Sequence, residues 1–203
     1  MTWSLKYKRS INCNRPKGFS QKQYCKYGRN KNKNKTRKLT GGSKNKTNPI
    51  KAIAYFNGEK IKGTVLFEED LKNKCVIITI NLEGLTPSHK HGFHVHECGD
   101  LTSGCESMCA HFNPYNKTHG NRTDKIRHVG DLGNLEADQT GKATYVIKDN
   151  IIKLRGNKAN IIGRGLIIHA DTDDCGHGTN KDSLITGNSG KRIACAIIGY
   201  AKQ

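Results

Sequence analysis

The first 48 residues of this 203-residue chain contain no aspartate or glutamate, although they contain 15 lysine and arginine residues. The following 155 residues contain 20 basic and 17 acidic residues, so the formal net charge of +18 falls almost wholly on the N-terminal segment. We therefore predict a basic, Lys- and Asn-rich tail over residues 1–48 and a nearly neutral domain over residues 49–203. The tail has too few apolar side chains to offset the entropy lost on ordering, and we expect it to be disordered.

Long apolar runs are absent as well. No stretch of the sequence approaches the roughly 20 apolar residues of a transmembrane helix, and the N-terminus lacks the apolar core of a secretory signal peptide. We therefore expect no membrane association and a cytoplasmic location in the cell or its host, where free thiols are usual and stable disulfides are exceptions. The basic tail leaves a virion or the nucleus as alternative locations.

Helical periodicity is the third absence, because no window of ten or more residues places its apolar side chains on one helical face. Short β-rich runs, several of them alternating apolar with polar residues, are instead separated by Gly, Asn, Asp or Pro, which predicts an all-β sandwich or barrel. Two stretches, 97–130 and 171–191, are long and irregular, and loops of that length in a compact domain are usually functional. The predicted strands are 52–56, 61–67, 75–82, 93–96, 143–148, 151–154, 161–170 and 193–200.

Histidines gather in and beside the long stretches. His94 and His96 lie two positions apart in a predicted strand, so both imidazoles project from the same face, where they could bind one metal ion. A single His-x-His pair is weak support for a metal site, because it often occurs by chance. Further metal-ligating residue types follow along the chain, namely His111, His119, His128, Asp131 and His169.

Together with the segment 192–195 (Arg-Ile-Ala-Cys), these residues and their spacing resemble the copper/zinc superoxide dismutase family, of the intracellular type, from about residue 50 to the C-terminus. The resemblance implies an eight-stranded Greek-key β-barrel or sandwich, in which the two long stretches are a zinc/disulfide loop and an electrostatic loop. It also implies dismutation of superoxide to oxygen and hydrogen peroxide by a copper redox cycle with a structural zinc, which protects against oxidative stress.

The resemblance assigns ligands to both metals. Three imidazoles and a carboxylate complete a tetrahedral zinc shell with no open position, as structural zinc sites require, whereas copper needs imidazoles with access left for a small molecule. In the family, the residue matching His111 bridges the two metals and supplies a proton to the reaction. The implied copper ligands are His94, His96, His111 and His169, and the implied zinc ligands are His111, His119, His128 and Asp131.

Residues around the ligands also match the family. Asp173 corresponds to an aspartate that links a copper ligand to a zinc ligand, by position His94 and His119, although Asp171 and Asp174 are competing candidates. Arg192 corresponds to the arginine that holds the superoxide anion beside copper. Thr186 and Gly187 match residues that narrow the family's channel.

The electrostatic loop departs from the family pattern at two positions. Lys181 stands where many members have glutamate, and Ile185 stands where they have lysine. Because superoxide is an anion, the charges that guide it to the site are rearranged, and we expect activity without assuming the family's usual speed.

The cysteines divide into one expected pair and several free thiols. By resemblance, Cys105 and Cys195 form the family's disulfide within the subunit. Cys98 and Cys109 flank Cys105, so alternative pairing, help with copper loading and free thiols all remain open interpretations. Cys98 also replaces an aromatic residue of the family's dimer interface, so we expect a homodimer with a monomer as the alternative. The cysteines without an assigned partner are Cys13, Cys25, Cys75 and Cys175.

Two other functions compete with the enzyme. A copper chaperone with a domain of the same fold would carry a CxxC motif near its N-terminus and a CxC motif near its C-terminus, and this sequence contains neither. The tail, with its 15 positive charges, could bind nucleic acid or another polyanion in a salt-dependent way. A solvated extension without a function is an equal alternative for the tail.

Overall fold

The computed structural model describes residues 11–12, 15, 17, 21 and 48–202. Almost all of the predicted tail therefore lies outside the described residues. The chain divides into two units, Met1–Lys46 and Thr47–Gln203, and the fold described below belongs to the second unit.

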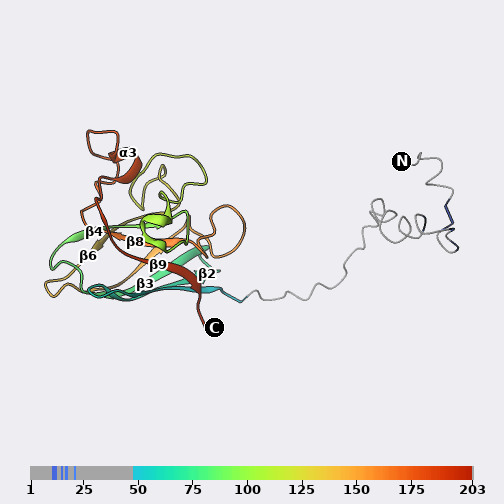
Figure 1. The fold of residues 1–203 in the computed structure, drawn as a ribbon, viewed down its shortest axis with the longest axis horizontal. Helices are drawn as coiled ribbons and strands as arrows, with labels where there is room; N and C mark the ends of the chain where they lie inside the picture. The colour runs from blue at the N-terminus through green and yellow to red at the C-terminus, as the bar shows by residue number, and fades with distance from the viewer. Residues whose placement is uncertain (1–10, 13–14, 16, 18–20, 22–47, 203) are drawn as a thin grey trace. The chain divides into compact units, whose positions relative to one another are not determined.

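Strands make up nearly all the regular structure of the second unit (Figure 1). One turn of 3₁₀ helix, η3 (Glu106–Met108), and one short helix, α3 (Ser183–Thr186), lie in the two long loops. The strands are β1 (Lys51–Asn57), β2 (Lys62–Asp70), β3 (Cys75–Glu83), β4 (Lys90–His96), β5 (Thr102–Cys105), β6 (Asp131–Glu136), β7 (Ala143–Asp149), β8 (Gly165–His169) and β9 (Arg192–Tyr200).

Eight of these strands form an antiparallel, nearly closed barrel in the order β6-β4-β8-β9-β1-β2-β3-β7. Strands β1, β2 and β3 are consecutive hairpins, whereas β4 pairs with β6 and β8, and β9 lies between β8 and β1. The all-β, eight-stranded Greek-key prediction is confirmed. The two long loops predicted from the sequence leave the barrel after β4 and after β8.

Two predicted strands differ from the structure, and two observed strands were not predicted. Segment 151–154 is not a strand, because Asp149 Oδ1 accepts the backbone N–H groups of Ile151 and Ile152 at 2.7 and 2.9 Å and turns the chain. The predicted strand 161–170 is ordered as β8 only from Gly165 to His169. The sequence patterns missed β5 and β6, which are rich in Gly, Ser, Asn and Asp residues that β-propensity disfavours.

Strand β4 is buried on both of its faces from His91 to His96, which explains how it can carry both core and site residues. Phe93 and Val95 belong to the hydrophobic core inside the barrel. His94 and His96 alternate with them and therefore point to the opposite face, beneath the long loops. The site thus stands on a strand that the core holds rigidly.

Candidate metal centre

Four buried imidazoles converge at one face of the barrel. His94 and His96 project from β4, and His169 ends β8. His111 lies within the long loop after β4 and forms an isolated bridge with His96. One ligand nitrogen of each lies within 4.8 Å of those of the other three, and the rings of His94 and His111 are 4.0 Å apart between centroids. The four form one group of suitable size for a metal ion.

Hydrogen bonds on the outer side of this group fix the tautomers of two rings. His96 Nδ1 lies 2.9 Å from the carbonyl oxygen of Cys109, and His169 Nδ1 lies 3.2 Å from that of Gly190. A carbonyl oxygen only accepts, so both Nδ1 atoms carry the proton. The two Nε2 atoms then face each other at 3.4 Å with their lone pairs, an arrangement that a cation between them would stabilise.

Burial keeps these imidazoles neutral, as metal binding requires. Burial and the neighbouring His111 ring lower the pKa of His94 to about 3. Burial likewise lowers the pKa of His169 to about 4. Nδ1 of His94 has no hydrogen-bond partner among the described residues, so its lone pair is available to a metal. The donor set therefore fits copper with imidazole ligands.

A second group gathers around Asp131 at the start of β6. The Nδ1 atoms of His111, His119 and His128 lie 3.1, 3.0 and 3.2 Å from Asp131 Oδ1. Burial alone would raise the pKa of Asp131, but hydrogen bonds to these three rings hold the pKa far below its usual range, so the carboxylate is ionised. Three imidazoles and a carboxylate are the donors of a closed zinc site.

Interatomic distance alone gathers a slightly different set of four residues around Asp131. His94, His111, His119 and Asp131 each offer an atom within 4.8 Å of the others. We favour His128 over His94 as the fourth member, because His128 Nδ1 faces the same Asp131 oxygen as the other two rings, whereas His94 Nε2 is engaged by Asp173 at 2.8 Å.

Asp173 lies between the two groups. Its Oδ2 is 2.8 Å from His94 Nε2, and its Oδ1 is 2.7 Å from His119 Nε2, so both rings donate to one carboxylate. Burial alone would lower the pKa of His119, but its contacts with Asp131 and Asp173 raise the pKa to about 9. The competing candidate Asp174 instead accepts from the hydroxyl of Ser183 at 2.8 Å.

Asn134 and Gly187 place Asp173, and the sequence analysis had assigned neither role. The Asn134 side chain accepts from the Asp173 backbone N–H at 2.8 Å and donates to the Asp173 carbonyl at 2.9 Å. Gly187 has a φ of +64°, and a Cβ there would lie 1.9 Å from Asp173 Oδ1. Only a residue without a side chain allows the loop to approach the carboxylate this closely.

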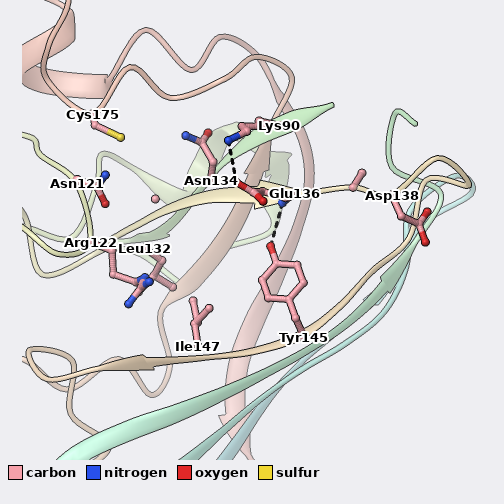
Figure 2. A pocket seen from close by; sticks show the side chains of 12 residues that line it. Lys90, Asn121, Arg122, Leu132, Asn134, Glu136, Asp138, Tyr145, Ile147 and Cys175 are labelled. Carbon is pink, nitrogen blue, oxygen red and sulfur yellow. Dashed lines mark hydrogen bonds and ion pairs between the residues drawn. The ribbon is translucent and has the colours of Figure 1, made fainter. Parts of the chain in front are cut away.

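Asn134 also borders a hollow of about 610 Å³ on the outer side of β6. Figure 2 shows the Asn134 side chain beside Lys90, whose ammonium group is paired with Glu136 at 2.8 Å. Tyr145 lies farther along the same hollow, and its hydroxyl accepts the Glu136 N–H at 2.9 Å. None of the imidazoles described above lines this hollow. The hollow therefore lies apart from the histidine groups, with Asn134 and Asp173 between them.

Arg127 is a buried residue that sequence reasoning missed. Its guanidinium pairs with Asp149 at the end of β7. The same group donates to the carbonyls of His128 and Asp131 at 3.1 and 2.8 Å. Arginine is rarely buried unless it is paired, and nothing local in the sequence signals this burial. The pair fixes the turn that presents His128 and Asp131.

A second cavity, of about 620 Å³, leads to the first histidine group and contains Arg192 in its lining. Arg192 Nη1 donates to the carbonyl of Cys105 at 2.7 Å, and Arg192 Nη2 donates to the carbonyl of Cys109 at 2.6 Å. Thr186 and Ile185 also line this cavity, whereas Gly187 does not. Ile185 is exposed and apolar at the rim, which leaves that position without the positive charge discussed above.

A disulfide joins Cys105 to Cys195, with a Cα–Cα distance of 5.6 Å. It connects the end of β5 to β9, three residues after Arg192. The same loop is thus fixed to β9 both by this covalent bond and by the hydrogen bonds of Arg192. Among the described cysteines, the free thiols are Cys75, Cys98, Cys109 and Cys175.

The three remaining histidines lie outside both groups. His91 Nδ1 donates to the carbonyl of His169 at 2.8 Å, which holds the backbone next to a group member. His177 is exposed, as expected for a loop residue. His89 is half-buried, and its Nε2 donates to the carbonyl of Ala170 at 3.2 Å.

The fold and the two adjoining histidine groups define an all-β metalloprotein with a two-metal centre. Residues 61–198 match the family model for copper/zinc superoxide dismutase. A superoxide dismutase [Cu-Zn] of Paramecium bursaria Chlorella virus 1 is 59% identical over 161 residues, which cover 79% of this chain and 84% of that protein. One from Neurospora crassa is 47% identical over 154 residues, which cover 75% of this chain and 99% of that protein.

A solved structure is similar as well. The crystal structure of the clock protein EA4 matches with a TM-score of 0.72 and 42% identity, covering 76% of this chain and 97% of that one. The chain therefore belongs to the copper/zinc superoxide dismutase family, with superoxide dismutation as its activity and copper and zinc as its cofactors. In the described part of the chain, no helix is long and apolar enough to cross a membrane.

Proposed function

We propose that His94, His96, His111 and His169 bind the copper ion of this enzyme, and that His111, His119, His128 and Asp131 bind its zinc ion. The position of His111 carries this proposal. Its Nδ1 faces Asp131 at 3.1 Å, and its ring also belongs to the first histidine group. An imidazole can bind one metal through each nitrogen when it is deprotonated, which two flanking cations favour.

When bound, copper supplies the one-electron chemistry of superoxide dismutation. The residues of this chain would contribute position, charge and protons. Arg192 would hold the superoxide anion in the cavity, because its guanidinium is fixed there by two loop carbonyls and keeps its positive charge. His111 Nε2 would bind a proton and pass it to the reduced anion. Asp173 would orient His94 and His119 through their Nε2–H groups.

Metal analysis of two single variants tests the assignment. His96→Gln should lose copper and keep zinc, because His96 belongs to the first group alone. His128→Gln should lose zinc and keep copper for the corresponding reason. Loss of both metals in equal measure from either variant would contradict the division into two sites.

Activity is tested on the full-length protein. Superoxide decay would be followed by stopped flow after loading both metals, with turnover normalised to bound copper and cyanide as the inhibitor. Rapid cyanide-sensitive turnover is expected. Full copper occupancy without turnover would contradict the assigned activity and favour copper transfer or storage.

We also propose that the chain forms a homodimer through the face that contains Gly99, Gly163 and Ile197. A Cβ on Gly99 would lie 2.0 Å from the Gly163 carbonyl and 3.3 Å from Ile197 Cγ2, so the three residues are adjacent, and the Ile197 side chain is exposed. Cys98 beside them offers less apolar area than an aromatic residue. Sedimentation at micromolar concentration would distinguish the dimer from the monomer alternative.

A cytoplasmic location and a polyanion-binding tail complete the proposal. The free thiols among the described cysteines suit a reducing compartment. The 15 positive charges of residues 1–48 would bind nucleic acid at low salt, and could retain the enzyme in a virion or the nucleus. A variant lacking residues 1–48 should lose this binding while keeping its metals. Equal binding by both forms would leave the tail as a solvated extension.

A further inference from the structure

Cys98 and Cys109 face one another across two antiparallel segments beside the copper-type histidine group. His96 and His111 form the bridge between these segments, and the Glu97 N–H donates to the Ala110 carbonyl at 2.9 Å. Opposite residues in such a pair have neighbouring Cβ atoms. The Cys98 N–H donates to the carbonyl of Met108, the residue next to Cys109, at 3.2 Å, which keeps the two segments paired as far as the cysteines.

The backbone of Cys109 is strained. Its φ of 63° and ψ of −151° lie in a region that is essentially restricted to glycine. Strain of this kind persists only where the surrounding structure over-determines the conformation, and it is concentrated at functional sites. A glycine would adopt this conformation freely, so the strain makes Cys109 a candidate for a role that needs its thiol.

The two thiols differ in access. Cys109 is exposed and lines the 620 Å³ cavity that also contains His96, His111 and Arg192. Cys98 is half-buried behind it. An accessible cysteine next to a second, resolving cysteine is the arrangement of peroxide-sensitive dithiols.

We propose that Cys98 and Cys109 form a second, reversible disulfide that is closed by hydrogen peroxide. The sulfur of Cys109 attacks the peroxide, the O–O bond breaks, and one water molecule leaves. The Cys98 sulfur then displaces hydroxide from the oxidised Cys109 sulfur, which forms the S–S bond and a second water molecule. Both thiols are oxidised, and one hydrogen peroxide is reduced. The oxidant is a product of the enzyme's own reaction, and its release into this cavity rests on the proposed copper ligands.

The bond would act on the site through the carbonyl of Cys109. That oxygen accepts from Arg192 Nη2 at 2.6 Å and from His96 Nδ1 at 2.9 Å. Closing the disulfide constrains the residue that orients both the anion-holding arginine and a proposed copper ligand. The redox state of the pair is therefore connected to substrate binding without any change in the ligands.

The test adds hydrogen peroxide to the full-length, metal-loaded protein, so its outcome does not depend on turnover. Separate samples taken before and after treatment are alkylated at their free thiols. Cleavage at Glu97, Asp100 and Glu106 then places Cys98, Cys105 and Cys109 on three different peptides for mass spectrometry. After peroxide, we expect Cys98 and Cys109 to become inaccessible to alkylation together and to appear as linked peptides. A dithiol reductant should restore both free thiols. Cys175→Ser should behave like the parent, and Cys98→Ser should form no link.

Three results would overturn the proposal. The first is irreversible oxidation of Cys109 while Cys98 remains alkylated. The second is a covalent dimer joined through Cys98 of two chains. The third is exchange with the neighbouring bridge, detected as a peptide that links Cys98 or Cys109 to Cys105 or Cys195.

Discussion

The guanidinium of Arg127 and the carboxylate of Asp149 form a buried ion pair behind the turn that carries His128 and Asp131. Arg127 also donates to the backbone carbonyl of Asp131 at 2.8 Å. The pair therefore connects the end of β7 to the proposed zinc ligands. A zinc shell assembled from loop residues depends on this kind of support from the barrel.

Replacement of Arg127 by methionine should destabilise the protein strongly. The change leaves the Asp149 carboxylate buried and unpaired, and breaking a buried pair in this way costs about 3–5 kcal/mol. Denaturant unfolding of the zinc-loaded protein measures the loss. The double variant Arg127→Met with Asp149→Asn should be more stable than Arg127→Met alone, because it removes the unpaired charge while the Asn oxygen can still accept from Ile151 and Ile152. A double variant that is less stable would contradict this explanation.

Replacement of Asp173 by asparagine should weaken metal binding by about 10- to 100-fold, the usual effect of losing an outer carboxylate. Asparagine has one side-chain oxygen, so it can accept from either His94 or His119 but cannot accept from both. Competition with a chromophoric chelator measures the affinity for each metal. Asp174→Asn is the matched control, because Asp174 contacts Ser183 and Asn188 rather than a histidine. Equal effects of the two changes would argue against a linking role for Asp173.

Replacement of Gly187 by alanine should combine two costs. The left-handed backbone disfavours any side chain by roughly 1–2 kcal/mol, and the new Cβ would also lie 1.9 Å from Asp173 Oδ1 and 2.5 Å from His119 Nε2. Gly156→Ala isolates the first cost, because Gly156 has a φ of +86° with nothing within 4 Å of the added Cβ. The midpoint temperature of thermal unfolding and the affinity for zinc should therefore both fall further in Gly187→Ala than in Gly156→Ala. Matching values in the two variants would show that the close approach to Asp173 is unimportant.

Replacement of Cys195 by serine should lower the free energy of unfolding by about 2–5 kcal/mol, the range for removal of a native disulfide. The bridge spans 90 residues, so its loss frees a long loop in the unfolded chain. Chemical unfolding under non-reducing conditions measures the change. Cys175→Ser, which removes a free thiol, should change stability far less. A Cys195→Ser protein as stable as its parent would mean that Arg192 and the loop contacts are sufficient.

Replacement of Ile185 by lysine should speed the reaction at low salt. The residue is exposed at the rim of the cavity that contains Arg192, and a positive charge there would attract superoxide. We expect kcat/KM to rise by a few-fold to about tenfold, with the gain lost as salt screens the charge. Val146→Lys adds the same charge on β7, away from the cavity lining, and should have little effect. An equal gain in both variants would indicate a general effect of net charge.

The sequence predicted the barrel and the strands that carry His94, His96 and His169, because period-two alternation is a local property. His94 and His96 are an example, since the strand that buries Phe93 and Val95 must direct both imidazoles to the other face. The prediction of a strand over residues 151–154 was wrong, also for a physical reason. Its apolar residues do enter the core, but the capping carboxylate of Asp149 turns the chain, which alternation does not reveal.

The residues that position the proposed metal ligands were harder to predict from the sequence than the proposed ligands themselves. Arg127 and Asn134 act through partners that lie 22 and 39 residues away in sequence, namely Asp149 and Asp173. Nothing near either residue distinguishes it from an exposed polar side chain. The close approach of Gly187 to Asp173 is likewise a tertiary property, set by how the electrostatic loop folds back over β6.

His111 belongs to both proposed ligand sets, and this makes the two metal affinities interdependent. By thermodynamic linkage, whatever factor bound zinc contributes to the affinity for copper, bound copper contributes to the affinity for zinc. The order in which the metals arrive thus changes the intermediate that forms but not the total free energy of loading. If bound zinc increases the affinity for copper, removal of either metal should therefore weaken the binding of the other by the same factor.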